Sequence, residues 1–518
     1  MSRLDRRTFL AGSVAAGLAM AGMAGRPRAA HAAASDLDFA SALDAARAIR
    51  SGQVSSVELT TRVLERIRQH NAKLNAIVTL TADAALARAR EADAALARRE
   101  WWGPFHGVPC TVKDTFEVAG VTTTAGSPAL RNHVPTRDAA VVARLRAAGA
   151  VLLGKTNVPL FAADWQSYNA VYGQTNNPWD VARTPGGSTG GGAAAIAAGL
   201  SYLEPGSDLA GSIRIPAHFC GIYGHKPTLD VVPQRGHIPP PPGISAGPPS
   251  TLAVVGPLAR SAADLLAALE VMGGPDGDEA TAWRWRLPPA RGARLTDYRI
   301  GYVLDDPRAP VSPEVKAVLV AAVESLRKAG VRLEEGWPPG LNLDAQYEAY
   351  LTILYAHYTD PVPEDRLEAL RRLAANQDGS YLARYARAVT APDALLRTME
   401  TRRRAARAIW QAYFRTHDAF LLPTALVAAF PHDHSGNQLT RVLTTPGGPR
   451  PYGDLCFWIS FATLGGLPAT TAPVGLTKEG LPVGLQIVGP YLEDATPIDV
   501  AGRLADVVGG FRPPPGYA

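Results

Sequence analysis

Short apolar runs alternate with a helical pattern in the first half of the chain, and this alternation limits the fold more than any other feature. The runs HGVPCTVKDTFEVAG, AAGAVLLGKTNVP and GLSYLEPGSD are each closed by Gly, Pro or Asp, which is typical of short buried strands. Between the first two lies DAAVVARLRAAG, a helical pattern that stops at Gly149. Strands that alternate with helices predict an α/β sheet that helices cover on both faces.

The segments on either side of this region are predicted to be mostly helical. Residues 37–100 contain SSVELTTRVLERIRQH, in which Ser55 and Glu58 match a capping box at a helix start. Residues 340–420 return to long amphipathic patterns such as APDALLRTMETRRRAARAIWQAYF. A Pro- and Gly-rich passage at residues 230–260 is predicted to lie on the surface.

The end of the chain and its overall division complete the predicted architecture. The segment GLPATTAPVGLTKEGLPVGLQIVGP predicts two strands joined by a turn at residues 478–480. No break in composition divides the rest of the chain convincingly. We therefore expect one large domain over residues 33–518, with a helical insertion at about residues 340–440.

Residues 1–32 have the pattern of an export signal. The paired Arg6 and Arg7 precede a Gly- and Ala-rich apolar run, which leads to the small-x-small sequence AHA ending at Ala32. This pattern predicts a twin-arginine signal, cleavage near Ala32, and a periplasmic or secreted protein. A retained membrane anchor is the alternative, but the run is too short and too weakly apolar for a comfortable span. We expect no stable membrane association after cleavage.

Charge and cysteine content exclude several classes of protein. The whole chain has a formal net charge of +5, and 47% of its residues are apolar. Removal of residues 1–32 takes away five arginines and one aspartate, which leaves about +1 and no basic footprint for nucleic acid. Three cysteines are a small and odd number, so disulfide bonds are not the main support of the fold. The balance is that of a soluble globular protein with a large core.

A glycine-rich stretch, RTPGGSTGGGAAAIAAGL at residues 183–200, sets Ser188 among glycines and leads straight into a helix of small residues. A flexible linker would be flanked by polar sequence, and a phosphate-binding loop would need a lysine or a different glycine spacing. The stretch also satisfies G-x-S-x-G, the nucleophile elbow of α/β-hydrolases, which requires a late histidine as base. The last histidine is His434, far from the end of the chain. The elbow stays open as a weaker hypothesis.

Two residues on either side of Ser188 favour a different catalytic set. Ser212 lies in EPGSDLAGSIRIPAHFCGIYGHKPT after a short loop, and Lys113 lies in apolar, strand-like sequence. A serine hydroxyl is a weak nucleophile and needs a base to take its proton. Lysine can be that base if burial lowers its pKa, and Ser188 can then relay the proton. Each residue alone also suits a structural role, so the hypothesis depends on their joint occurrence.

The motifs GGSTGG, GSDLAGSIRIPAHFCGIYGHKPT and VKDTFEVAG, in this spacing, resemble the amidase signature family of serine hydrolases. The similarity has its signature core at about residues 100–230 and resumes in the C-terminal strand pair. It implies a single large α/β domain with a mixed, twisted sheet, and it implies neither cofactor nor metal. It also implies a triad of Ser212 as nucleophile, Ser188 as bridging serine after a cis peptide bond to Gly187, and Lys113 as base.

The resemblance further assigns an oxyanion loop, whose backbone donors would stabilise a tetrahedral intermediate. These donors are the N–H groups of Leu209, Ala210, Gly211 and Ser212. The chain departs from the common family pattern at Thr189, Ala210 and His225. Thr189 keeps a hydroxyl, Ala210 keeps its N–H, and we expect His225 to be structural.

The remaining histidines and cysteines favour structural interpretations. His432 and His434 flank Asp433 as a candidate metal pair, but a solvated loop is the stronger interpretation. Cys220 has no basic partner nearby in the sequence, which favours a buried, inert thiol.

The resemblance implies hydrolysis of a carboxylic amide of a small molecule, with esters and carbamates open to the same chemistry. Two rival functions remain. One is a protein similar to the glutamine-using component of tRNA-dependent amidotransferases, against which the export signal argues because tRNA is cytoplasmic. The other is a catalytically silent binding protein on the same fold, against which the intact triad argues. No nucleic-acid partner is expected, and a homodimer stays open.

The substrate pocket is expected in the stretch between the lysine and the first serine, which shapes the acyl pocket in the family. The residues predicted to line it are Ala162, Asp164 and Trp165. A small side chain at Ala162 and an aromatic ring at Trp165 would suit an aryl or medium-sized acyl amide.

Overall fold

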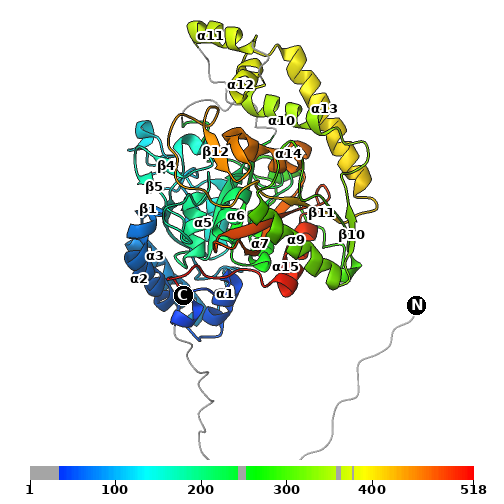
Figure 1. Cartoon of the computed structure of the whole chain (residues 1–518). Coiled ribbons are helices and arrows are strands. Elements are labelled where there is room, and N and C mark those ends of the chain that lie inside the picture. Colours follow the sequence, from blue (N-terminus) through cyan, green and yellow to red (C-terminus); the bar gives the residue numbers. More distant parts are fainter. Residues whose placement is uncertain (1–33, 243–251, 357–362, 376–378) are drawn as a thin grey trace, which may run out of the picture.

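The computed structural model describes residues 34–242, 252–356, 363–375 and 379–518, and Figure 1 shows its arrangement. The predicted signal at residues 1–32 lies outside the described residues. None of the helices in the described ranges is long and apolar enough to span a membrane.

Within the described ranges, the largest sheet has eight strands in the order β10-β9-β11-β15-β14-β7-β8-β6. Strand β9 is parallel to β10 and β11, and the other neighbours are antiparallel. The sheet is therefore mixed, as predicted. Its strands are β6 (Leu203–Asp208), β7 (Tyr223–Lys226), β8 (Val254–Ala259), β9 (Arg299–Tyr302), β10 (Arg332–Glu335), β11 (Ala419–Pro423), β14 (Ala469–Leu476) and β15 (Pro482–Val488).

A second sheet of three strands in the described chain carries the predicted lysine. Strand β3 (Val151–Thr156) lies between β1 (Ile77–Leu80) and β2 (Pro109–Lys113), antiparallel to the first and parallel to the second. Strands β2 and β3 confirm the predicted apolar strands, and β1 was missed inside the segment predicted to be helical. Strand β2 also contacts β6, which brings the last residue of β2 beside the large sheet.

The N-terminal segment forms helices α1 (Ala42–Arg50), α2 (Ser56–Leu74) and α3 (Ala82–Ala97), drawn in blue in Figure 1. The capping box at Ser55 and Glu58 is formed as predicted, because each side chain accepts a hydrogen bond from the other residue's backbone N–H. Helix α4 (Ala140–Ala147) ends before Gly149, also as predicted.

Helices cover the large sheet in two layers. Helices α5 (Gly190–Ala197) and α6 (Arg214–Cys220) contact each other and the sheet, whereas α7 (Ala262–Met272) and α9 (Pro313–Lys328) pack with α15 (Ala495–Val508). The small residues of α5 allow a close approach, since a Cβ on Gly192 would lie 2.0 Å from Oε1 of the buried Glu204. Helix α14 (Cys456–Gly465) packs beside α6, and the short helix α8 (Glu279–Ala282) lies in a connection.

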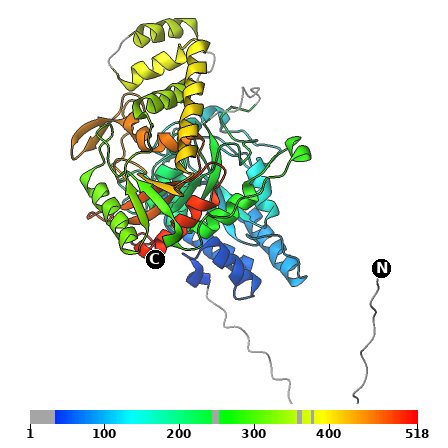
Figure 2. The same cartoon turned by 90° about the vertical axis from the view of Figure 1, so that its right-hand side faces the viewer.

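A helical arm projects from the sheet, and Figures 1 and 2 show its outer part well away from the core. The arm consists of α10 (Leu343–Ala356), α11 (Glu364–Ala374), α12 (Tyr381–Val389) and α13 (Asp393–Tyr413). The predicted insertion at residues 340–440 was therefore too long at its C-terminal end. Strand β11 follows directly and lies between β9 and β15, because its apolar side chains are all buried in the sheet.

The structure corrects the predicted surface passage and confirms the predicted C-terminal strand pair. The predicted surface passage at residues 230–260 includes β8, a fully buried strand between β7 and β6. The C-terminal strand pair is confirmed, with β14 antiparallel to β15 and a turn at residues 478–480. Short hairpins are formed by β4 (Tyr168–Asn169) with β5 (Gly173–Gln174), and by β12 (Val442–Thr445) with β13 (Gly448–Pro451).

Candidate active site

Lys113 ends strand β2 and is completely buried. Its Nζ lies 2.8 Å from Oγ of Ser188 and 2.9 Å from Oγ of Ser207. Burial lowers the pKa of Lys113 to about 7, although the negative charges of Glu204 and Asp208 act in the opposite direction. The lysine is thus held by hydroxyl groups, in surroundings that favour its neutral form.

Ser188 and Ser212 lie at the ends of two different elements and meet beside β6. Ser188 precedes α5, its peptide bond to Gly187 is cis as the resemblance implies, and its side chain is completely buried. Ser212 lies between β6 and α6 and is 7% exposed. The N–H of Thr189 donates to the Ser212 carbonyl at 3.1 Å, so the two serine segments are in direct contact.

The hydroxyl groups of Ser188 and Ser212 form no hydrogen bond with each other among the described residues. In resting active sites such bonds are often long and tighten when substrate binds. The structure therefore supports the link between Lys113 and Ser188 directly, and the link to Ser212 stays a prediction.

A buried ion pair shapes the loop between β6 and α6. The guanidinium of Arg214 donates to both carboxylate oxygens of Asp208, at 3.0 and 2.8 Å, and both side chains are completely buried. Burial alone would raise the pKa of Asp208, but the charge and hydrogen bonds of Arg214 outweigh burial and lower it. The carboxylate also accepts from the N–H groups of Gly211 and Ile213, at 3.0 and 3.1 Å.

This arrangement changes the predicted set of oxyanion donors. Four N–H groups were expected to face the substrate, but that of Gly211 is already bound to Asp208. Within the described chain, the N–H groups of Leu209, Ala210 and Ser212 make no hydrogen bond to protein, which leaves them available for an oxyanion. Gly211 has a φ of 90°, a backbone conformation that turns the loop at this point and favours glycine.

The predicted pocket residues lie against the catalytic loops, but not all face a substrate. The indole N–H of Trp165 donates to the carbonyl of Ala210 at 2.6 Å. Asp164 instead forms an ion pair with Arg441, at 3.0 Å, and accepts a hydrogen bond from Tyr452 at 2.7 Å. Its carboxylate is therefore occupied by protein partners. Ala162 lies in a short 3-10 turn with a φ of 60°, and it borders this segment.

Sequence reasoning missed two residues beside Lys113. Ser207 lies five positions before the predicted nucleophile, and its position at the end of β6 was the only available signal. His237 contacts the Ser207 hydroxyl at 2.8 Å from within the Pro- and Gly-rich passage. Nothing in the local sequence indicates that this passage returns to β2.

The remaining predicted candidates are structural. His225 is completely buried on β7, where its ring nitrogens contact Thr470 at 2.9 Å and Asp494 at 3.2 Å. Cys220 is a free, buried thiol whose pKa is raised by burial. The ring of His434 stacks on Tyr168 with centroids 3.7 Å apart. In the described part of the chain, no group of three His, Cys, Asp or Glu could hold a metal ion.

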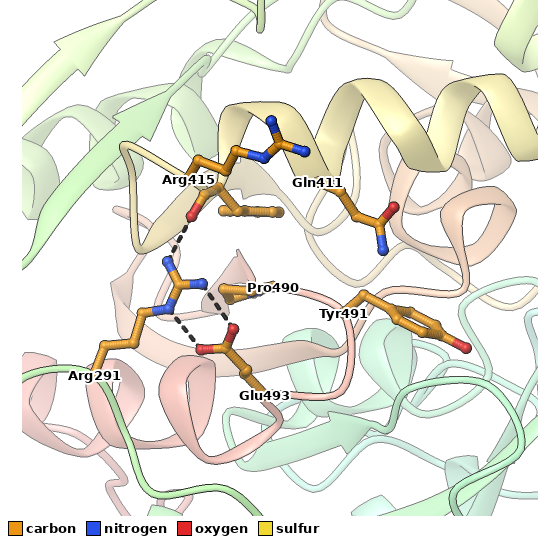
Figure 3. A pocket seen from close by; sticks show the side chains of 7 residues that line it. Arg291, Gln411, Arg415, Pro490, Tyr491 and Glu493 are labelled. Atoms are coloured by element: carbon orange, nitrogen blue, oxygen red, sulfur yellow. Dashed lines mark hydrogen bonds and ion pairs between the residues drawn. The ribbon is translucent and has the colours of Figure 1, made fainter.

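A surface cavity of about 440 Å³ lies at the C-terminal end of α13 and is separate from the predicted site. Figure 3 shows the guanidinium group of Arg291 directed at the carboxylate of Glu493, with which it forms an ion pair. The charge of Arg291 is therefore balanced by a protein group. None of the predicted catalytic residues lines this cavity. Its lining residues are Arg291, Gln411, Phe414, Arg415, Pro490, Tyr491 and Glu493.

Comparisons with known proteins agree with this fold and motif pattern. A family model described as Amidase matches residues 58–497. A glutamyl-tRNA(Gln) amidotransferase subunit of Synechococcus sp. (strain CC9605) is 33% identical over 495 residues, which cover 90% of this chain and 96% of that protein.

Two solved structures are similar over almost their whole length. Native peptide amidase from Stenotrophomonas maltophilia is 29% identical with a TM-score of 0.71, covering 92% of this chain and 99% of that one. A structure from a vestigial protein complex, described as revealing the evolutionary origins of an s-triazine catabolic enzyme, is 29% identical with a TM-score of 0.76. It covers 91% of this chain and 99% of that one.

The mixed eight-stranded sheet and its covering helices define a single large α/β domain of the type found in amidase signature enzymes. With the family model matched over most of its length, the chain belongs to the amidase signature family.

Replacing Arg214 with methionine is expected to lower the free energy of unfolding by about 3–5 kcal/mol, because it leaves the Asp208 carboxylate buried without its partner. The double variant Asp208→Asn/Arg214→Met removes both charges and is expected to lose less. Urea unfolding followed by circular dichroism measures both variants.

The matched control for this prediction is Arg299→Met. Arg299 pairs with Glu334 on the surface, where both side chains are about half exposed, so its loss should lower the free energy of unfolding far less than the loss of Arg214. A double variant as unstable as Arg214→Met, or more so, would contradict the role assigned to the buried pair.

Proposed function

We propose that this protein hydrolyses a carboxylic amide of a small molecule through an acyl-enzyme on Ser212. The observation that carries the proposal is the hydrogen bond of 2.8 Å between Ser188 and a lysine that is completely buried. A lysine whose pKa burial lowers to about 7 can exist as a neutral base near neutral pH.

The proposed cycle moves one proton along Lys113, Ser188 and Ser212 in both directions. Lys113 takes the proton of Ser188 while Ser188 takes that of Ser212, and the Ser212 oxygen attacks the amide carbonyl. The free N–H groups of the loop stabilise the negative oxygen of the tetrahedral intermediate. The C–N bond then breaks as the amine receives the proton back through Ser188. Water, activated by the same relay, hydrolyses the ester and releases the acid.

Family relatives support an amide as substrate. The peptide amidase of Stenotrophomonas maltophilia is 29% identical over 92% of this chain, and its name describes it as an amidase of peptides. Esters and carbamates would react by the same chemistry, because the acyl-enzyme formed from them has the same bond to Ser212.

A component of an amidotransferase is the second candidate function, and the curated relatives favour it. The glutamyl-tRNA(Gln) amidotransferase subunit of Synechococcus sp. (strain CC9605) is 33% identical over almost its whole length. The two functions differ in whether the protein needs a partner to complete its reaction. A hydrolase cleaves its amide alone, whereas an amidotransferase component passes ammonia from its substrate to a partner. The predicted export signal supports the hydrolase.

We further propose that residues 1–32 direct the folded protein out of the cytoplasm. The variant Arg6→Lys/Arg7→Lys keeps the charge but removes the arginine pair, and it is expected to stay in the cytoplasm. Immunoblots of periplasmic and cytoplasmic fractions measure this. The matched control is Arg26→Lys/Arg28→Lys, which should be exported and cleaved. Equal export of both variants would contradict a twin-arginine signal.

The catalytic proposal is tested by labelling the purified protein with a fluorophosphonate probe and locating the label by peptide mass spectrometry. Label is expected on Ser212, none in Ser212→Ala, and labelling slower by about 10²- to 10⁴-fold in Lys113→Met. Lys226→Met is the matched control, since Lys226 is also completely buried but contacts the carbonyl of Pro227. Label on Ser188 that persists in Ser212→Ala would instead support the nucleophile elbow.

The rate of Ser212 labelling is expected to rise with pH through about 7, because only the neutral form of Lys113 can accept a proton. Burial also brings the pKa values of Lys226 and Glu204 to about 7, so the assignment needs both variants. Lys226→Met should keep the inflection. Glu204→Gln should move it to lower pH, because the Glu204 charge raises the pKa of Lys113. An inflection that disappears in Lys226→Met would exclude Lys113 as the titrating base.

A further inference from the structure

We infer that His237 is a positioning residue, which acts through Ser207 to direct the lone pair of Lys113 onto Ser188. The inference rests on the function proposed above. It is carried by a continuous series of side-chain contacts: 2.8 Å from His237 to Ser207, 2.9 Å from Ser207 to Lys113, and 2.8 Å from Lys113 to Ser188.

The backbone holds His237 firmly at this place. Its segment pairs with the residues that follow Lys113, through an antiparallel bridge between Phe116 and His237. The N–H of Ile238 donates to the carbonyl of Thr115 at 2.7 Å, and the ring of Phe116 packs edge-on against the imidazole at 4.9 Å. The imidazole is therefore fixed next to the end of β2 and has little freedom to turn.

The partners of the imidazole determine which nitrogen carries its proton. Nδ1 lies 3.3 Å from the carbonyl of Pro239, and a carbonyl can only accept, so Nδ1 must carry the hydrogen. Nε2 of a neutral ring is then an acceptor, and the hydroxyl of Ser207 must donate to it. Burial and the charge of Lys113 lower the pKa of His237 to about 3, so the ring is neutral wherever Lys113 can act as a base.

The orientation of Ser207 in turn sets the orientation of the amine. Since the only hydrogen of the Ser207 hydroxyl is used toward His237, its oxygen can only accept from Nζ of Lys113. The second amine hydrogen has the Ser207 carbonyl as its partner, at 3.5 Å. Both hydrogens of the neutral amine are then occupied on the Ser207 side. The lone pair is left facing Ser188, which is the direction that proton removal requires.

Loss of the imidazole acceptor would release the Ser207 hydroxyl. It could then donate its hydrogen to the Lys113 lone pair and compete directly with Ser188 for the base. The titratable groups that face Lys113 in the described chain are Glu204, Asp208 and His237, and of these His237 is the one that reaches it through a hydroxyl hydrogen bond. The neutral imidazole thus affects Lys113 by orienting the Ser207 hydroxyl group, and not through an electric charge.

The test compares the rate of fluorophosphonate labelling of Ser212 in His237→Leu, His237→Gln, Ser207→Ala and the double variant Ser207→Ala/His237→Leu. His237→Leu is expected to label about 10- to 100-fold more slowly. The effect should be smaller than that of removing the base, because Lys113 is still present and only its orientation is lost. His237→Gln should recover most of the rate, because its amide oxygen can accept from Ser207. With Ser207 already removed, His237→Leu should change the rate less than about 2-fold.

The outcomes separate this inference from a packing role and from the proposed function. Equal slowing by His237→Leu in both backgrounds, or no recovery in His237→Gln, would overturn the inference, because loss of packing on Phe116 does not depend on Ser207. If Ser207→Ala labels too slowly to measure, the comparison of His237→Leu with His237→Gln decides alone. A wild-type protein that does not label at all would overturn the proposed function and this inference with it.

Discussion

The proposed chemistry depends on one buried lysine that has no carboxylate in hydrogen-bond contact. Two buried lysines lie on adjacent strands, and their surroundings differ. Lys155 on β3 forms an ion pair with Asp114 at 3.0 Å, whereas Lys113 on β2 contacts hydroxyl groups and a carbonyl. Hydroxyl groups can donate or accept, so they solvate a neutral amine as well as an ammonium ion. Burial lowers the pKa of both lysines, and for Lys113, which has no counter-ion in contact, it falls to about 7, a value that suits a base.

The other half of the site depends on a buried pair of opposite charge. Arg214 is tied to Asp208 and also donates to the carbonyl of Ile459, to Gln486 and to Thr463. It thus joins β6, α6, α14 and β15. A buried ion pair of this kind contributes little net stability compared with apolar packing, because both ions lose their hydration. Its role here is geometric, since Asp208 accepts from the N–H groups of Gly211 and Ile213 and so fixes the course of the loop.

Sequence reasoning recovered what depends on local pattern. Strands β2, β3 and β6 and the capping box of α2 are encoded in short, contiguous motifs, and so are Lys113 and Ser188, which the fold brings within 2.8 Å. It failed where a position depends on a distant partner. The sequence of β11 lies within the predicted helical insertion, and only its pairing with β9 and β15 shows that it is a strand. His237 lies in the predicted surface passage, and only its pairing with the residues after β2 brings it to Lys113. The hydrogen bond from the N–H of Gly211 to Asp208 could not be predicted for a different reason. Every residue except proline has a backbone N–H, so the residue types do not indicate which N–H a carboxylate will bind.

The segment that contains Asp164 and Trp165 contacts both loops that carry the predicted catalytic serines. A Cβ on Gly187 would lie 2.4 Å from the carbonyl oxygen of Asp164, so this segment packs directly on the peptide before Ser188. Trp165 reaches from the same segment to the carbonyl of Ala210 in the oxyanion loop. Asp164 is itself held by Arg441, which precedes the β12–β13 hairpin. Because interiors are close-packed, we expect a shift of that hairpin to be transmitted through Asp164 to the loops that carry Ser188 and Ser212. Sequence changes in the hairpin are therefore expected to alter the geometry around Lys113, Ser188 and Ser212 even where these three residues are unchanged.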